Sequence, residues 1–146
     1  MSSPTAGAWR RFLAEDYQAR IQVHALDGYP EFALKPQHGV PLLAVVDAVI
    51  VFNRESPAEQ RFDGIHFDNE PYLLLGWKDR LRREQILREF LELNVECQRR
   101  VRTQSGLAFG VDSPFWWQEL DAAEGADGLI AHGQDLLAYA DKAGAV

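Results

Sequence analysis

Apolar residues recur at helical spacing in two parts of the chain. The stripe in the first part consists of Trp9, Phe12, Leu13, Tyr17 and Ile21. The stripe in the second part consists of Ile86, Leu87, Phe90, Leu91, Asn94, Cys97 and Val101. An i, i+3, i+4 pattern places side chains on one face of a helix, so we predict helices over residues 5–22 and 80–102.

A different pattern predicts strands between these two helices. Residues 41–52 are rich in Val and Ile, whose branched side chains pack well on a pleated surface and lose rotamer freedom in a helix. We therefore predict the central, best-buried strand at 41–52. Shorter strands are predicted at 31–35, 62–67 and 72–77, where turn-forming residues flank short apolar runs.

The C-terminal part of the chain is predicted to add two strands and a helix. Strands over 107–111 and 115–120 would turn at 112–114, and residues 126–143 have a broadly helical pattern weakened by Gly133. The order is then helix, several strands, long helix, two strands and C-terminal helix. This order predicts an α+β fold in which three helices pack on a mostly antiparallel sheet.

Length and cysteine content favour one domain. The chain of 146 residues can bury an apolar core without disulfides or a structural metal, and its single Cys97 cannot form an internal disulfide. We expect a single α+β domain over residues 1–146, with frayed ends at 1–5 and 144–146. The place of Cys97 on an apolar stripe predicts a buried structural thiol rather than a nucleophile.

Net charge and targeting features narrow the classes of function. The net charge of −7 disfavours nucleic-acid binding, because the phosphate backbone would be repelled. No apolar run approaches the roughly 20 residues of a membrane helix, and the N-terminus lacks the features of a signal peptide. We therefore expect a cytoplasmic protein that binds no membrane. The sequence has no Gly-rich phosphate loop, and we expect no cofactor.

Three potential ligands, His66, Asp68 and Glu70, alternate along the chain. On an extended segment they would project from one face, as ligands for a divalent cation or as groups for acid–base catalysis. Polar alternation at a strand edge or a turn produces the same pattern without any ligand. No second His cluster at ligand spacing accompanies them, so we predict no metal site and keep the three residues as the candidates for one.

A basic run, Arg99, Arg100 and Arg102, lies in the last turn of the second predicted helix. Cations there interact favourably with the negative end of the helix dipole, and Glu96 is placed to pair with Arg100. The alternative is a docking patch for carboxylates or phosphates, which guanidinium groups bind through paired hydrogen bonds. The three arginines are therefore candidate partner-binding residues.

Consecutive aromatic residues, Phe115, Trp116 and Trp117, form the second candidate partner-binding set. Successive residues of a strand point to opposite faces, so the three cannot all enter one core. At least one should lie on the outer face of the sheet, covered either by a helix or by a partner. Tryptophan is enriched in binding hot spots, which is the argument for a partner.

Two segments follow each other in the second half of the chain. They are Ile86-Leu-Arg-Glu-Phe-Leu-Glu-Leu-Asn94 and, after a polar turn, Gly106-Leu-Ala-Phe-Gly-Val-Asp112. Together with the order of elements they resemble the type III secretion chaperone family, which includes the Tir chaperone, over about residues 70–143. The resemblance implies a homodimer without enzymatic activity, whose sheet surfaces bind an extended segment of a secreted effector.

Four functions follow as hypotheses. The first is a noncatalytic protein-binding protein, in particular a secretion chaperone that holds its protein partner by strand addition or in a groove. The second is an immunity protein or antitoxin, whose acidic surface would neutralise a basic toxin. The third is a small metal-dependent enzyme at His66, Asp68 and Glu70, and the fourth is a structural subunit of a phage or secretion machine. The first is the one we favour from the sequence.

Overall fold

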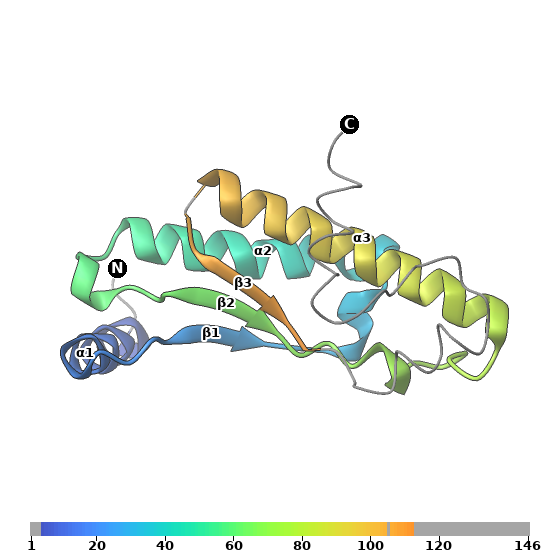
Figure 1. Ribbon diagram of the computed structural model, residues 1–146, viewed down its shortest axis with the longest axis horizontal. Coiled ribbons are helices and arrows are strands. Elements are labelled where there is room, and N and C mark those ends of the chain that lie inside the picture. Colours follow the sequence, from blue (N-terminus) through green and yellow to red (C-terminus); the bar gives the residue numbers. More distant parts are fainter. Residues whose placement is uncertain (1–3, 105, 113–146) are drawn as a thin grey trace.

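The computed structural model describes residues 4–104 and 106–112 (Figure 1). The α-helices of this part of the chain are α1 (Pro4–Ala19), α2 (Lys35–Arg54) and α3 (Arg80–Gln104). The strands are β1 (His24–Asp27), β2 (Gly64–Phe67) and β3 (Ala108–Val111). Short 3-10 helices lie in the connections, and they are η1 (Pro30–Ala33), η2 (Ala58–Gln60) and η3 (Pro71–Leu73).

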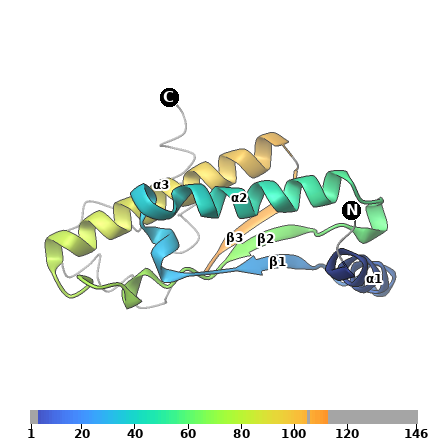
Figure 2. The same cartoon turned by 180° about the vertical axis from the view of Figure 1, so that it is seen from behind.

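The three strands form a parallel sheet in the order β1-β2-β3. Helix α2 connects β1 to β2, and α3 connects β2 to β3, and both helices lie on the same face of the sheet (Figures 1 and 2). Helix α1 lies beyond the ends at which the strands begin (Figure 1). The prediction of a mostly antiparallel sheet is therefore wrong. The fold is α+β with three helices in its described part, but its small sheet is parallel.

The physical reason for this difference lies in segment 41–52, which the sequence predicts as a central strand and which forms most of helix α2. Its Leu42, Val46 and Ile50 recur every four residues and are buried. Burial of this stripe outweighs the weak preference of Val and Ile for strands. A helix at this point turns the link between β1 and β2 into a crossover, which is the connection that parallel strands require.

Two other predicted strands are also wrong. Residues 31–35 lie in η1 and the start of α2, and residues 72–77 lie in η3 and the turns after it. Each of these 3-10 helices begins with a proline, which fits the first position of a helix but cannot donate to a strand ladder. Strand β1 was not predicted, because its four residues carry no clear alternation of apolar and polar side chains.

The remaining elements agree with the predictions where the structure describes them. Helices at 5–22 and 80–102 and strands at 62–67 and 107–111 are confirmed as α1, α3, β2 and β3. The predicted strand at 115–120 and helix at 126–143 lie outside the described residues. Within 4–104 and 106–112, no helix combines the length and apolar character needed to cross a membrane.

The main core lies between β2 and the two crossover helices. Ile65 and Phe67 of β2 are fully buried, as are Cys97 and Val101 of α3 above them. A second cluster joins η1 to the first half of α3, and it consists of Ala33, Ile86, Leu87, Phe90 and Leu91. Full burial of a large apolar side chain stabilises a fold by about 1.5–3 kcal/mol. The sheet is therefore held from one side, by α2 and α3.

The other face of the sheet carries two histidines that lie over glycines of the next strand. His24 is paired in register with Gly64, and His66 with Gly110. A Cβ added at Gly64 would lie 2.7 Å from the His24 ring, and one added at Gly110 would lie 2.6 Å from Nδ1 of His66. Each glycine therefore makes the room that the neighbouring imidazole occupies.

Asn53 at the end of α2 holds the turn into β2. Its amide nitrogen donates to the carbonyl oxygen of Phe62 at 2.8 Å, and its amide oxygen accepts from the Phe62 N–H at 3.0 Å. The Phe62 ring in turn contacts Phe52 of α2 and Trp9 of α1, with ring centroids 5.5 and 6.0 Å apart. One buried side chain thus fixes the segment on which α1 packs.

We expect Asn53→Ala to destabilise the fold by about 1–3 kcal/mol, because both backbone groups of Phe62 lose their partner in a part-buried place. Urea unfolding followed by circular dichroism measures the change. Glu59→Ala, at an exposed position of η2, is the control and should change the free energy of unfolding by less than about 0.5 kcal/mol. Equal stability of Asn53→Ala and the wild type would contradict the proposed role of the amide.

Candidate functional site

Acidic residues gather at the edge of the sheet where the three parallel strands end. Asp27 is the last residue of β1, and Asp68 and Asp112 come directly after β2 and β3. Backbone hydrogen bonds continue the ladder past the strands, from Asp68 N to Asp27 O at 3.0 Å and from Asp112 N to Phe67 O at 2.9 Å. The three residues are therefore side by side. The carboxyl ends of parallel strands are where α/β proteins place their binding and catalytic groups.

His66 joins this edge from the face of the sheet opposite to α2 and α3. Its neighbours in β2, Ile65 and Phe67, are buried under the helices, so the alternation of the strand directs His66 the other way. Its Nε2 lies 3.0 Å from Oδ1 of Asp112. Gly110 provides the space for the ring. The imidazole thus links the end of β2 to the end of β3.

The loop from Asp68 to Glu70 has an unusual and well-anchored conformation. Asn69 is 1% exposed, and its amide oxygen accepts a long hydrogen bond, 3.5 Å, from the backbone N–H of Tyr29. Glu70 has a φ of 41°, in the left-handed region that is unfavourable for a residue with a side chain. Its carboxylate accepts a hydrogen bond from the Tyr72 hydroxyl. Strained backbone of this kind persists where its surroundings hold it and is frequent at functional sites.

Asp68 is the carboxyl group of this edge whose pKa is shifted. Desolvation of the exposed side chain raises its pKa, and the nearby charges of Glu70 and Asp112 raise it further, while His66 acts in the opposite direction. The pKa of Tyr72 is raised to about 12, chiefly by its hydrogen bond to Glu70. Tyr72 therefore stays protonated and donates to Glu70 over the whole physiological range. The edge holds one carboxyl that retains its proton more readily and another that is held by a hydrogen-bond donor.

The predicted candidates His66, Asp68 and Glu70 are thus close enough to influence one another, but not as ligands on one strand face. Strand β2 ends at Phe67, so Asp68 and Glu70 belong to a loop. In the described part of the chain, no three His, Cys, Asp or Glu side chains converge in a geometry that could hold a metal ion. The arrangement is suited to proton transfer by carboxyl groups.

The arginines of the basic run are occupied within the fold. Arg99 forms a forked pair with Glu96 at 2.8–3.0 Å, and this bond is the main cause of the lowered pKa of Glu96. Arg100 pairs with Asp47 at 2.8 Å and so ties α3 to α2, while Arg102 also has an interaction partner. These contacts support the structural interpretation of the run. Phe115, Trp116 and Trp117 lie outside the described residues, so their role stays a prediction.

Cys97 is confirmed as a buried thiol of the core. Burial raises its pKa to about 12, against a weaker opposing effect of Arg100. A thiol that stays protonated is a poor nucleophile.

Sequence reasoning missed Asp112 and Tyr72 as members of the site. Asp112 was assigned to a turn between antiparallel strands, which placed it away from Asp68. Had residues 41–52 been assigned to a helix, two crossovers would have made the strands parallel and brought the acidic residues after β2 and β3 to one edge. The sequence signal for this site is the aspartate that directly follows each of the two strands, Asp68 after β2 and Asp112 after β3.

No family model, curated protein or solved structure matched the chain in comparisons with known proteins.

Gly28 allows the end of β1 to approach the Asp68 loop. A Cβ at Gly28 would lie 2.0 Å from the carbonyl oxygen of Asp68, so backbone must move to accommodate it.

We expect Gly28→Ala to destabilise the fold by about 1–3 kcal/mol and to displace the loop. Gly7→Ala in α1 is the matched control, since nothing lies within 4 Å of that position. It should stabilise by about 0.5–1 kcal/mol, because alanine is the better helix former. Thermal unfolding of both variants measures this, and a neutral Gly28→Ala would contradict the close approach.

The raised pKa of Asp68 has a consequence for stability. A carboxyl group whose pKa is higher in the folded than in the unfolded chain destabilises the fold when it ionises. Asp68→Asn should therefore raise Tm at pH 7, and the gain should vanish at pH 3, below the ordinary pKa of 3.8, where the wild-type side chain is also neutral. Scanning calorimetry at the two pH values provides the measurement. A lower Tm for Asp68→Asn at pH 7 would show that ionised Asp68 is needed for stability.

Proposed function

We propose that the protein is a hydrolase that cleaves a glycosidic bond by acid–base catalysis at the carboxyl ends of its strands. The observation that carries this proposal is the pair Asp68 and Glu70, two carboxyl groups in one anchored loop with different surroundings. Glycosidases use such a pair, one residue as the acid and the other as the base or nucleophile. The position after β2 in a parallel sheet is where catalytic groups are found in other proteins of this architecture.

The surroundings of the two carboxyl groups suggest their roles. The pKa of Asp68 is shifted upward, which is the direction that suits a general acid, because such a group keeps its proton to higher pH and can give it to the leaving oxygen. Glu70, as a carboxylate held by the Tyr72 hydroxyl, suits either the activation of water or direct attack on the anomeric carbon. His66 and Asp112 would tune this acid, because the charge of His66 lowers the pKa of Asp68 and that of Asp112 raises it.

An exposed aromatic side chain at the same edge supports a carbohydrate as the substrate. Tyr29 follows β1, is 53% exposed, and is joined through its backbone to Asn69 of the catalytic loop. The apolar face of a sugar ring packs well on an aromatic ring, so Tyr29 would offer a surface for a sugar unit next to the bond that is cleaved. The ring also contacts Phe32, at a centroid distance of 6.0 Å, which limits its orientations.

The protein-binding hypothesis from the sequence stays a prediction. Its main residues, Phe115, Trp116 and Trp117, lie outside the described residues, and Arg99 and Arg100 already pair with acidic side chains. A partner, a homodimer and a cytoplasmic location stay predictions as well. We favour the hydrolase because Asp68 and Glu70 lie in one described loop at the carboxyl ends of the strands.

Hydrolysis of a panel of aryl glycosides is the test of this function. We expect Glu70→Gln to lose about 10²–10⁴-fold in kcat/KM on every glycoside that the wild type cleaves. Asp68→Asn should lose a similar factor on glycosides with a poor leaving group, but much less on dinitrophenyl glycosides, which need no proton to depart. The wild-type pH profile should fall on its basic limb as Asp68 ionises, and Asp68→Asn should lack this limb.

Glu59→Gln, which removes a carboxylate from the exposed η2, is the matched control and should keep full activity. Nuclear magnetic resonance of the first product anomer would assign Glu70 as base or nucleophile, since these give opposite stereochemistry. A wild-type protein without activity on any glycoside of the panel, or an active Glu70→Gln variant, would contradict the proposal.

A further inference from the structure

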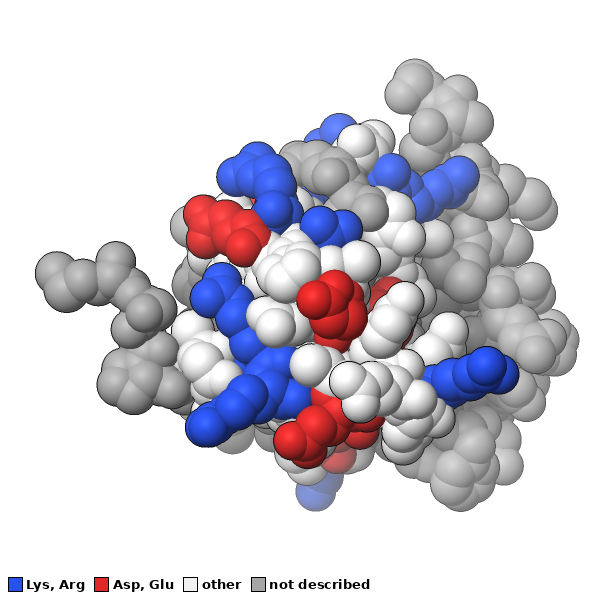
Figure 3. All heavy atoms as spheres, turned by 90° about the vertical axis from the view of Figure 1, so that its left-hand side faces the viewer, with Lys and Arg blue, Asp and Glu red and all other residues white. Residues whose placement is uncertain are grey.

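A pocket lies at the opposite end of the sheet from the carboxyl edge. It has a volume of about 490 Å³, in the range of small-molecule sites, and is formed where α1 ends and where β1 and β2 begin. Leu13, which is buried, and Val23 supply part of an apolar lining. Basic side chains lie on several sides of this end of the molecule, with acidic ones between them (Figure 3).

Arg20 occupies a position in this pocket where glycine is normally preferred. The N–H of Ile21 bonds to Asp16 O at 3.0 Å and the N–H of Arg20 to Tyr17 O at 3.1 Å, which is the Schellman pattern that ends a helix. Arg20 is the residue after the helix in this pattern, and its φ is 58°. A left-handed backbone is unfavourable for arginine and easy for glycine. Arg20 therefore has a backbone conformation that disfavours any residue with a side chain.

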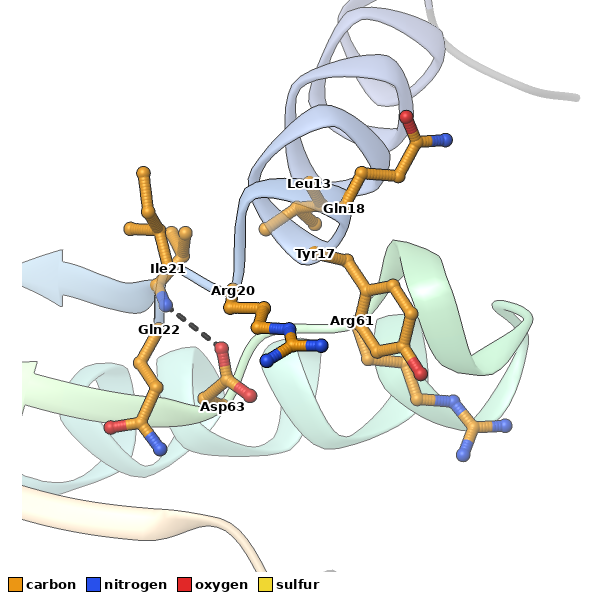
Figure 4. Close-up of a pocket in the computed structure, with 9 residues that line it drawn as sticks. Leu13, Tyr17, Gln18, Arg20, Ile21, Gln22, Arg61 and Asp63 are labelled. Carbon is orange, nitrogen blue, oxygen red and sulfur yellow. Dashed lines mark hydrogen bonds between the residues drawn. The ribbon is translucent and has the colours of Figure 1, made fainter.

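The polar groups of the pocket leave several donors unused. Figure 4 shows the Arg20 side chain running across the pocket between Asp63 and Tyr17. Within the described residues, neither the Arg20 guanidinium nor the Tyr17 hydroxyl has a hydrogen-bond or ion-pair partner. Arg61 is held in place by one hydrogen bond, from its Nε to Ser56 O at 2.8 Å, and its other donors stay available.

The charge of the lining is net positive. Asp63 contributes one negative charge, but one of its oxygens already accepts the N–H of Val23 at 2.8 Å. Arg20 and Arg61 contribute two positive charges, of which the Arg20 guanidinium lies beside Asp63 and the Arg61 guanidinium points outward beyond the Tyr17 ring (Figure 4). Guanidinium groups bind carboxylate and phosphate through paired, charge-assisted hydrogen bonds. Tyr17 and Leu13 add an aromatic and an aliphatic surface beside them.

From these observations we infer that the pocket binds a small molecule with an oxyanion on an apolar body, with Arg20 as the residue that holds the oxyanion. The oxyanion is a phosphate or a carboxylate, which share this chemistry. This site is separate from the carboxyl edge, so it does not depend on the proposed hydrolase activity.

Calorimetric titration of the full chain with phenyl phosphate, benzoate and inorganic phosphate tests the inference. We expect at least one of the two aromatic anions to bind with a Kd of about 1 mM or lower, and more tightly than inorganic phosphate. Whichever of the two binds more tightly identifies the oxyanion. Arg20→Gln should weaken binding at least about tenfold, because the paired hydrogen bonds are lost, and Arg20→Lys should restore it only in part.

Arg20→Gly separates binding from folding. It should lose binding as Arg20→Gln does, while its Tm rises, because glycine relieves the left-handed backbone. Arg80→Gln, at the exposed start of α3, removes the same charge elsewhere and should bind as the wild type does. Three results would each overturn the inference: no binding of any probe at about 10 mM, an equal loss in Arg80→Gln, or wild-type affinity in Arg20→Gly.

Discussion

The burial of β2 under two helices is the interaction on which the rest of the structure depends. Ile65 and Phe67 have no exposed surface, because α2 and α3 both cover this central strand. Each of these helices is also the crossover between two neighbouring strands and carries the chain back along the sheet, so all three strands run in one direction. The parallel sheet then has two chemically different ends, one where the strands begin and one where they finish.

These two ends of the sheet carry different kinds of side chain. The finishing end presents carboxyl groups and a histidine, held by a buried asparagine and by backbone bonds that run past the strands. The starting end presents guanidinium groups around an apolar hollow, next to the last turn of α1. A chain with a net charge of −7 thus keeps an electropositive pocket at one end of its sheet. The net charge of the chain does not reveal this difference, because acidic side chains lie at one end of the sheet and arginines at the other.

The spacing of apolar residues predicted individual helices correctly, but the predicted order of elements gave the wrong strand direction. The stripes of α1 and α3 have regular helical spacing, so both helices could be located from sequence. Helix α2 could not, because its composition favours a strand and only its spacing of four, Leu42 to Val46 to Ile50, favours a helix. Because residues 41–52 were predicted as a strand, the crossover between β1 and β2 was missed and the sheet was predicted to be antiparallel. His66, Asp68 and Glu70 could be picked out as reactive groups, yet Asp112 and Tyr72 became their neighbours only through the parallel pairing and the left-handed turn at Glu70.

The two imidazoles that lie over glycines have a consequence for how this sheet can change during evolution. Each histidine and the glycine opposite it form one unit across two strands, His24 with Gly64 and His66 with Gly110. A side chain at either glycine would collide with the imidazole, and at Gly64 also with the backbone oxygen of Ala108, so the histidine must move or be replaced by a smaller residue before the glycine can change. Variation at these four positions should therefore be correlated in pairs between β1 and β2 and between β2 and β3, and independent substitution should be selected against.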